Sequence, residues 1–515
     1  MTGSSGVWTV SSTRLSSIWL TLLSKRMTLC RVTLSKRPDA AADRPALTPQ
    51  ARRAIAVVLV GAVLAFLDAT IVNVSLKSLS AELGATLDTI QWAVTVYLLV
   101  QAAVLPMTGW AARRVGAKRL YIAALLLFTL ASVACAAAGS VGVLIAARVV
   151  QGIGAGVMIP VGQMILVTAA GREGMARAMV AAGIPMVLTP VIGPTIGGLL
   201  LEYAGWQWIF LINAPIGVVG LVLAVRLLPP DGRAETAGAL DIFGLILVSL
   251  GMVGITYGLS EAASRGLTDS LVLITLCGGT VLVAAFVAHA LRSDNPLLDL
   301  RLWRDRLFAA GTVSTFVIGA VTFGAMVLLP LYFQIVRHQD AAHTGLLMAP
   351  QGIGAAIAMG LSARLYERVG ALTGLLGALV GCAATVPFML LTADTPYVLL
   401  GGAMVLRGIG IGLAAMPAMT AAMRNLTSSQ IIDATPQLTI MQRIGGSIGT
   451  AAFVVVLQRH LPADGTGGAS AFGVTFAWVL AAAALAIVPT AMMAALDVTG
   501  GRRAIRPGYP GRFGR

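Results

Sequence analysis

Long apolar stretches recur along almost the whole chain, and they constrain its fold more than any other feature of the sequence. Fourteen of them are long enough to cross a bilayer, which takes about 20 residues in a helix. They lie at 54–75, 91–110, 119–138, 142–169, 179–201, 208–228, 240–259, 270–291, 308–332, 343–362, 371–392, 397–421, 438–458 and 471–496. Only 11% of the 515 residues are charged, against about 25% in soluble domains. The sequence therefore predicts an all-α integral membrane protein with 14 transmembrane helices.

The positive charges are distributed unevenly along this pattern. A net charge of +15 would also suit a nucleic-acid-binding protein. If both termini are cytoplasmic, however, 29 of the 36 Lys and Arg residues fall in cytoplasmic segments and four in external loops. This is the positive-inside bias of membrane proteins. It predicts a multi-pass protein of the cell (inner) membrane with both termini cytoplasmic, and it accounts for the charge without nucleic acid.

The chain repeats itself at an offset of about 255 residues. GWAARRVGAKR (109–119) follows the second stretch, and ARLYERVG (363–370) follows the tenth. Within the fourth and twelfth stretches, RVVQGIGAG and LRGIGIG align Gly152 with Gly408. Repetition of this kind indicates a duplication. Because eight spans separate the members of each pair, both copies have the same orientation in the membrane.

The repeat divides the chain into parts. We predict a disordered basic cytoplasmic tail at 1–53, an N-terminal six-helix bundle at 54–228, an inserted pair of helices (the seventh and eighth) with flanking loops at 229–300, a C-terminal six-helix bundle at 301–496 and a cytoplasmic C-tail at 497–515. Translation from Met1 and from Met27 both remain open.

Charged residues at the two repeated turns are candidates for a gate. Arginine at a cytoplasmic turn can pair with acids or with helix C-termini of a neighbouring helix when an inner gate closes. The alternative is plain anchoring by positive charge. The residues concerned are Gly109, Arg113, Arg114, Gly116, Lys118 and Arg119 in the first copy, and Glu367, Arg368 and Gly370 in the second.

Asp68 is the only carboxylate well inside an apolar stretch. Placing a charged side chain there costs about 2.5–3.5 kcal/mol on insertion scales. Such a group can bind a proton on one side of the membrane and release it on the other as the conformation changes. The alternative is a structural anchor, hydrogen-bonded to Thr70, to Asn73 or to a neighbouring helix.

Arg148 lies inside the fourth stretch. A guanidinium keeps its proton, so it needs a partner or water. We expect Arg148 to form a switchable pair with Asp68 that couples to a proton; a permanent salt bridge and a snorkelling side chain are the alternatives. Arg407 has a similar place in the second half, without an obvious acid inside the membrane.

Small residues and prolines mark the fourth and fifth stretches. Small side chains let helix backbones approach closely, and proline kinks a helix, so this pattern favours a compliant, closely packed interface. The residues are Gln151, Gly152 and Gly156 in the fourth stretch, and Pro190, Gly193, Pro194, Gly197 and Gly198 in the fifth. No phosphate-binding GxxxxGK[ST] loop occurs, so transport would draw its energy from an ion gradient.

Several polar and aromatic side chains inside the stretches are candidates for a central substrate cavity. They are Asn73, Trp92, Tyr97, Gln101 and Gln334. The four cysteines show neither metal-ligand spacing nor a disulfide framework, so no metal site is expected.

Together these motifs resemble the fourteen-helix drug:proton antiporter branch of the major facilitator superfamily. The resemblance covers about residues 54–496. It comprises the first-helix acidic motif with Asp68, the loop 2–3 motif at 109–119, the fourth-helix motif with Arg148, the antiporter motif at 190–198 and the start of helix 6 at 206–217. One departure is that Arg113 stands where the family usually has an acid. The gating role of that acid is then absent, or shifted to Glu367.

The resemblance implies a secondary active transporter that works by alternating access. It would export drugs, antibiotics or other small amphipathic compounds in exchange for protons, as a monomer, with a proton gradient in place of a cofactor. Two alternatives stay open: an exporter of an endogenous lipid, siderophore or metabolite, and a proton-coupled importer. A membrane sensor is disfavoured because the chain has no sizeable soluble domain. An enzyme is disfavoured because no catalytic constellation occurs.

Overall fold

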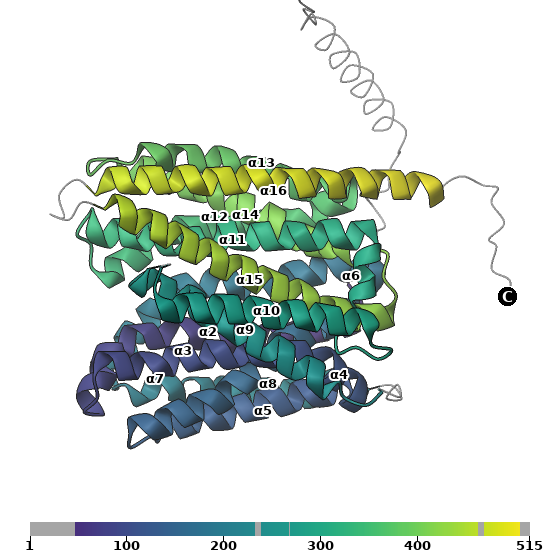
Figure 1. The fold of residues 1–515 in the computed structure, drawn as a ribbon, viewed down its shortest axis with the longest axis horizontal. Helices are drawn as coiled ribbons and strands as arrows, with labels where there is room; N and C mark the ends of the chain where they lie inside the picture. Colours follow the sequence, from purple (N-terminus) through teal and green to yellow (C-terminus); the bar gives the residue numbers. More distant parts are fainter. Residues whose placement is uncertain (1–46, 232–237, 267, 462–467, 505–515) are drawn as a thin grey trace, which may run out of the picture. The chain divides into compact units, whose positions relative to one another are not determined.

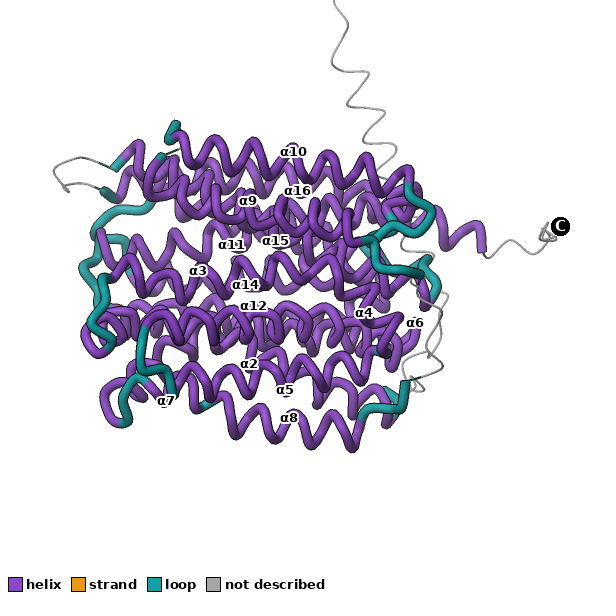
Figure 2. The backbone as a smooth tube through the Cα atoms, turned by 60° about the horizontal axis from the view of Figure 1, so that its bottom comes forward, coloured by secondary structure: helices purple, strands orange, loops and turns teal. Residues whose placement is uncertain are grey.

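Helices are the only regular elements in the part of the chain that the computed structural model describes, which is residues 47–231, 238–266, 268–461 and 468–504. All of them belong to the unit that begins at Pro49. Within this unit the long helices run side by side (Figures 1 and 2). The expected tail at 1–53 falls almost wholly outside the described residues, as does most of the C-tail at 497–515.

The first half and the helices that follow it have these bounds. The first half consists of α2 (Pro49–Glu82), α3 (Leu87–Val104), η1 (Leu105–Met107), α4 (Thr108–Val115), α5 (Ala117–Ala136), α6 (Val141–Tyr203), α7 (Gln207–Leu211) and α8 (Asn213–Leu227). The expected inserted pair is α9 (Ile242–Arg265) and α10 (Ser270–Arg292). These two pack on each other, and α9 also contacts α3 and α15.

The second half repeats the arrangement. It consists of η2 (Leu300–Arg304), α11 (Arg306–Ile335), α12 (Ala341–Val369), α13 (Leu372–Thr385), η3 (Val386–Leu390), α14 (Tyr397–Ala422), α15 (Ser428–His460) and α16 (Ala469–Ala504). Figure 1 shows the first half in purple and blue and the second in green and yellow.

Thirteen helical segments of the described residues are long and apolar enough to cross a membrane. They match all the expected stretches except the fifth, at 179–201. That stretch is helical and forms the second part of α6, which is 63 residues long. The backbone at Gly171 leaves helical geometry, with φ 62° and ψ −176°, so α6 is two helices joined at that residue. The fourteen expected spans are thus all helical, and an all-α membrane fold is confirmed.

The prolines of the fifth stretch do not interrupt their helix. From Arg172 to Tyr203 the backbone stays helical, so these prolines lie within a continuous helix. A helix at membrane depth can tolerate proline because neighbouring groups satisfy the freed carbonyls. Within this helix, Thr189 Oγ1 donates to the carbonyl oxygen of Pro185 at 2.5 Å.

Four acidic residues near the spans cap helix N-termini. A carboxylate there accepts from backbone N–H groups that have no partner inside the helix and is favoured by the helix dipole. The capping residues are Asp241 on α9, Asp269 on α10, Asp305 on α11 and Asp340 on α12. These four acids are therefore accounted for locally, unlike Asp68, which lies well inside its span.

The repeated glycines make equivalent contacts in the two halves. A methyl group on Gly156 would lie 3.0 Å from the Cα of Gln101 on α3, and one on Gly412 would lie 2.7 Å from the carbonyl oxygen of Ala355 on α12. Gly152 and Gly408 likewise face the backbones of α3 and α12. The α6–α3 packing of the first half thus recurs as α14–α12 in the second, as a duplication requires.

Candidate functional site

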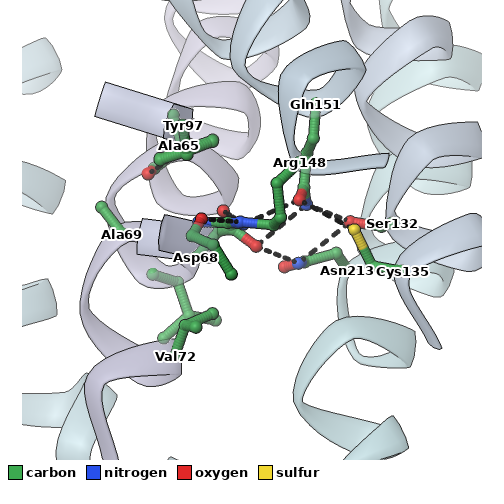
Figure 3. A network of polar contacts seen from close by, with 12 residues as sticks. Ala65, Asp68, Ala69, Val72, Tyr97, Ser132, Cys135, Arg148, Gln151 and Asn213 are labelled. Atoms are coloured by element: carbon green, nitrogen blue, oxygen red, sulfur yellow. Dashed lines mark hydrogen bonds and ion pairs between the residues drawn. The ribbon is translucent and has the colours of Figure 1, made fainter. Parts of the chain in front are cut away.

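Asp68 lies at the centre of a polar network inside the first half (Figure 3). Its side chain is 0% exposed. Oδ2 accepts from Nη1 of Arg148 at 2.6 Å, and Oδ1 accepts from Nε2 of Gln151 at 2.9 Å and from Nδ2 of Asn213 at 3.1 Å. All three contacts come from N–H donors, so this geometry suits the ionised form of the carboxylate.

Arg148 is equally enclosed. Its Nε donates to the carbonyl oxygen of Ala93 at 2.9 Å, and Nη1 also donates to Oε1 of Gln151 at 2.7 Å. The guanidinium carbon lies 4.0 Å from the ring centroid of Tyr97, a cation–π contact. Its Nη2 has no partner within the described residues. Asp68 supplies the one negative charge of this network, so the pair is neutral as a whole.

Five helices bring the network together. Asp68 is on α2, Tyr97 on α3, Ser132 on α5, Arg148 on α6 and Asn213 on α8. Ser132 Oγ accepts from Gln151 Nε2 at 2.5 Å and from Asn213 Nδ2 at 3.2 Å, which holds the two amides in place. The site is thus built wholly within one half of the molecule.

The glycines beside Arg148 determine how closely α6 approaches α3 and α5. A methyl group on Gly152 would lie 2.9 Å from the carbonyl oxygen of Tyr97, and one on Gly154 would lie 2.8 Å from that of Ala124 on α5. Such distances fall well inside ordinary contact. The helix therefore needs glycine to approach α3 and α5 closely enough for Arg148 and Gln151 to reach Asp68.

The alternative anchors for Asp68 within its own helix are not used. Thr70 Oγ1 donates to the carbonyl oxygens of Phe66 and Leu67, and Asn73 Nδ2 donates to that of Ala69. The anchoring donors come from neighbouring helices instead. Thr70 also faces Gly193 of the fifth stretch, where a methyl group would collide with its Oγ1.

The loop 2–3 motif forms a capped turn. Gly116 has φ +97°, a conformation that favours glycine, and a Cβ there would overlap the carboxylate of Asp231. Asp231 accepts from the backbone N–H groups of Lys118 at 2.8 Å and Arg119 at 3.1 Å, which are at the start of α5. Lys118 Nζ donates to the carbonyls of Val225 and Leu228 at the end of α8. The turn therefore ties α5 to α8.

The second copy forms the same turn. Gly370 has φ +61°, and a Cβ there would overlap the carboxylate of Asp497. Asp497 accepts from the N–H of Ala371 at 3.0 Å and pairs with Arg424. Arg368 is exposed, as are Arg114 and Arg119 of the first copy. Neither Asp231 nor Asp497 was singled out from the sequence, because each capping acid lies more than 100 residues from its turn.

Two ion pairs join the halves at the end of the bundle that carries these turns, which we call the Gly116 end. Arg113 of α4 pairs with Asp433 of α15, and Arg177 of α6 pairs with Glu367 of α12 at 2.8 Å between Nε and Oε1. Gly109 packs beside the first pair: a methyl group there would lie 3.2 Å from the carbonyl oxygen of Ile432. Glu367 thus has a partner across the halves, and the acid opposite Arg113 is on α15.

The predicted cavity residues lie in different surroundings. Tyr97 and Gln101 are buried, at 0% and 3% exposed. Trp92 stacks on Tyr257 of α9, with ring centroids 5.8 Å apart, and it is 43% exposed. Asn73 and Gln334 are exposed. The structure therefore brings Tyr97 into the Asp68 network, places Gln101 one helical turn away, and does not bring the other three to either residue.

The fifth-stretch motif contacts α2 through Gly193, which is buried together with Gly197. A methyl group on Gly198 would have no neighbour within 4 Å, so packing does not require glycine at this position. The side chains of Pro190 and Pro194 lie outside the described residues.

Sequence reasoning missed Ser132 and Asn213 as members of the network. Asn213 belongs to the motif at 206–217, so the motif was visible but the role of its amide was not. Ser132 sits in an apolar run that gives no signal of its own. Among the described residues, no cluster of His, Cys, Asp and Glu has the composition of a metal site.

Comparison with known proteins agrees with this architecture. Residues 58–450 match the family model described as Major Facilitator Superfamily. The multidrug resistance protein B homolog of Mycobacterium tuberculosis (strain ATCC 25618 / H37Rv) is 38% identical over 411 residues, 79% of this chain and 76% of that protein. The putative multidrug resistance protein MdtD of Salmonella heidelberg (strain SL476) is 30% identical over 438 residues, 84% of this chain and 92% of that protein.

Two solved structures share the fold at low sequence identity. The human organic anion transporter MFSD10 superposes with a TM-score of 0.57 at 15% identity, over 84% of this chain and 99% of that one. The proton:xylose symporter XylE superposes with a TM-score of 0.56 at 14% sequence identity, over 85% of this chain and 95% of that one. With a family match across most of its length and relatives of this similarity, the chain is a membrane transporter that belongs to the major facilitator superfamily.

Proposed function

We propose that this protein is a proton-driven antiporter of the bacterial cell membrane that exports small amphipathic compounds by alternating access. The observation that carries the proposal is the buried pair of Asp68 and Arg148, 2.6 Å apart and closed off from solvent. The relatives named for multidrug resistance support the choice of cargo.

The coupling follows from charge balance. With Asp68 ionised, Arg148 is neutralised and the network can stay buried. A proton on Asp68 removes that negative charge and leaves a buried guanidinium uncompensated, which is unfavourable at low dielectric. Protonation therefore weakens the pair and favours a rearrangement of α2 against α6. Proton binding and the conformation described here exclude each other, which is the condition for coupling.

The gate is the pair of contacts at the Gly116 end, which we assign to the cytoplasmic side. Arg113–Asp433 and Arg177–Glu367 hold the two halves together there. This polarity reverses the family pattern: the first half supplies arginine where an acid is usual, and α15 supplies the acid. Closing this end and opening the other would release cargo outward, with protons entering from outside. The membrane potential adds about 2.3 kcal/mol per charge per 100 mV to that proton flow.

Transport of a dye panel into inside-out vesicles, measured with and without a pH gradient, tests the proposal. In such vesicles, export from the cell appears as uptake into the lumen. We expect uptake into the vesicles only when their interior is acidic, and none after Asp68→Asn. Uptake that ignores the pH gradient would show that protons do not drive transport. Accumulation in intact cells would instead indicate import.

A further inference from the structure

The described membrane spans hold more positive than negative charge at membrane depth. Away from the helix ends, the Asp, Glu, Lys and Arg residues of the described spans are Asp68, Arg148, Arg407 and Arg443. Asp68 and Arg148 neutralise each other. No carboxylate of the described chain pairs with Arg407 or Arg443, and arginine stays protonated. Two positive charges at membrane depth are therefore uncompensated.

Arg443 lies where the two halves meet. It is halfway along α15, and its Nη2 donates to Oε1 of Gln101 on α3 at 2.7 Å. This amide solvates the guanidinium but carries no charge to balance it. Ten residues earlier on the same helix, Asp433 provides an acid for Arg113. The chain thus pairs its gate arginine with a carboxylate and leaves the arginine at membrane depth with a neutral partner.

Arg407 adds a second positive charge to the same half. By the repeat it takes the place of Gln151, which in the first half donates to Asp68. Arg407 is 2% exposed, its Nε and Nη1 have no partner among the described residues, and its Nη2 reaches the carbonyl oxygen of Val321 only at 3.4 Å. The rings of Phe388 and Phe476 lie about 6 Å away. The second half therefore lacks the acid that the first half has at this level.

We propose that the cargo is an acidic amphiphile whose carboxylate binds Arg443 between α3 and α15. This assignment rests on the proposed export function and names its substrate class. A carboxylate would replace the neutral amide of Gln101 as partner and balance the charge of Arg443. A cationic compound would instead meet the uncompensated charge of Arg443. Gln101 is one turn from Tyr97, whose ring stacks on Arg148, so the bound acid would lie beside the proton-coupling network.

Three probes that share one dansyl fluorophore and one alkyl chain test the substrate class. Their head groups are a carboxylate, a primary amide and a trimethylammonium. Equilibrium binding to the purified full-length protein in phosphatidylcholine nanodiscs needs no gradient. We expect the carboxylate probe to bind roughly tenfold or more tightly than the amide, as one hydrogen bond to a charged group provides, and the trimethylammonium probe to bind most weakly. Tighter binding of the trimethylammonium probe would overturn the proposal.

Variants of Arg443 locate the binding group. Arg443→Gln should cost roughly tenfold or more in affinity for the carboxylate probe and less than about twofold for the amide. Arg443→Lys, which keeps the charge, should retain the preference for the acid. Arg459→Gln on the exposed end of the same helix is the matched control and should change neither value. Equal losses for acid and amide would make Arg443 structural. If Arg443→Gln does not fold, the order of the wild-type affinities for the three probes, together with the affinities of Arg443→Lys, tests the proposal.

Two further outcomes separate this proposal from others. If phosphatidylglycerol in the nanodiscs competes with the carboxylate probe at Arg443, the group binds a lipid head group and the cargo assignment fails. If the acid binds through Arg443 but its movement in proteoliposomes ignores the pH gradient, the substrate class stands and proton coupling fails. If the trimethylammonium probe is exported by a pH gradient while the acid does not bind, coupling stands and the substrate class fails.

Discussion

Arg148 donates to Asp68 across 2.6 Å, and neither side chain reaches solvent. Beside this pair, Gln151 and Asn213 both donate to the other carboxylate oxygen, Oδ1. An ionised aspartate is thereby satisfied at a depth where it would otherwise be costly. The same arrangement penalises a neutral aspartate, because Arg148 would lose its counter-charge. In the proposed mechanism, the pair links a proton to the packing of α2, α3 and α6.

Asp68→Asn should abolish transport that a pH gradient drives. The amide resembles the carboxylate in shape but cannot exchange a proton. Cargo exchange without a gradient, measured as counterflow in proteoliposomes, should persist at a reduced rate. Full gradient-driven efflux by the variant would remove Asp68 from the mechanism.

The same substitution should also lower stability, because it leaves Arg148 buried without a counter-charge. Breaking one side of a buried pair costs about 3–5 kcal/mol. We expect a lower apparent melting temperature in detergent, measured by gel filtration with fluorescence detection after heating. Adding Arg148→Gln to Asp68→Asn should recover much of the loss, since no charge then remains. A double variant that is less stable than Asp68→Asn alone would contradict this charge argument.

Reversing the charges of the gate pair should separate electrostatics from shape. Arg113→Asp places two carboxylates opposite each other and should slow efflux several-fold, because a half-buried pair of this kind contributes roughly 1 kcal/mol after solvent screening. Asp433→Arg in the same molecule should restore the rate. Arg114→Asp, at the exposed neighbouring position, is the control for net charge and should change little. If the double variant Arg113→Asp, Asp433→Arg exports cargo as slowly as Arg113→Asp alone, this contact does not control the gate.

Gly152→Ala should destabilise the first half by about 1–3 kcal/mol, the usual cost of overpacking. Its methyl group would lie 2.9 Å from the carbonyl oxygen of Tyr97 and push α3 away from α6. Gly142→Ala on the same helix has nothing within 4 Å and should be neutral or slightly stabilising. Thermal unfolding of both variants, with efflux rates, measures the difference. Equal behaviour would show that α6 does not need this close approach.

Much of the fold was predictable because the bilayer leaves few choices for a chain this apolar. Helix positions followed from the apolar stretches, and the duplicated halves from the motif offsets. The prolines of the fifth stretch lie within a continuous helix, because a helix at membrane depth can tolerate proline.

Of the residues in the Asp68 network, mainly the charged ones could be predicted from the sequence. Asp68 and Arg148 stand out because an ionisable group at membrane depth requires a partner. Ser132 and Asn213 carry no charge, so their place depends on which faces of α5 and α8 turn inward. Asp231 and Asp497 were missed because a capping acid and its turn are joined by the tertiary fold rather than by sequence spacing.

Proton movement coupled to cargo tests the central claim most directly. Purified protein in proteoliposomes, with a pH-sensitive dye in the lumen and an outward gradient of the best-transported probe, reports both flows at once. The account predicts that protons enter as cargo leaves, and that Asp68→Asn abolishes the proton signal. Cargo efflux without proton entry in the wild type, or an unchanged proton signal in Asp68→Asn, would contradict it.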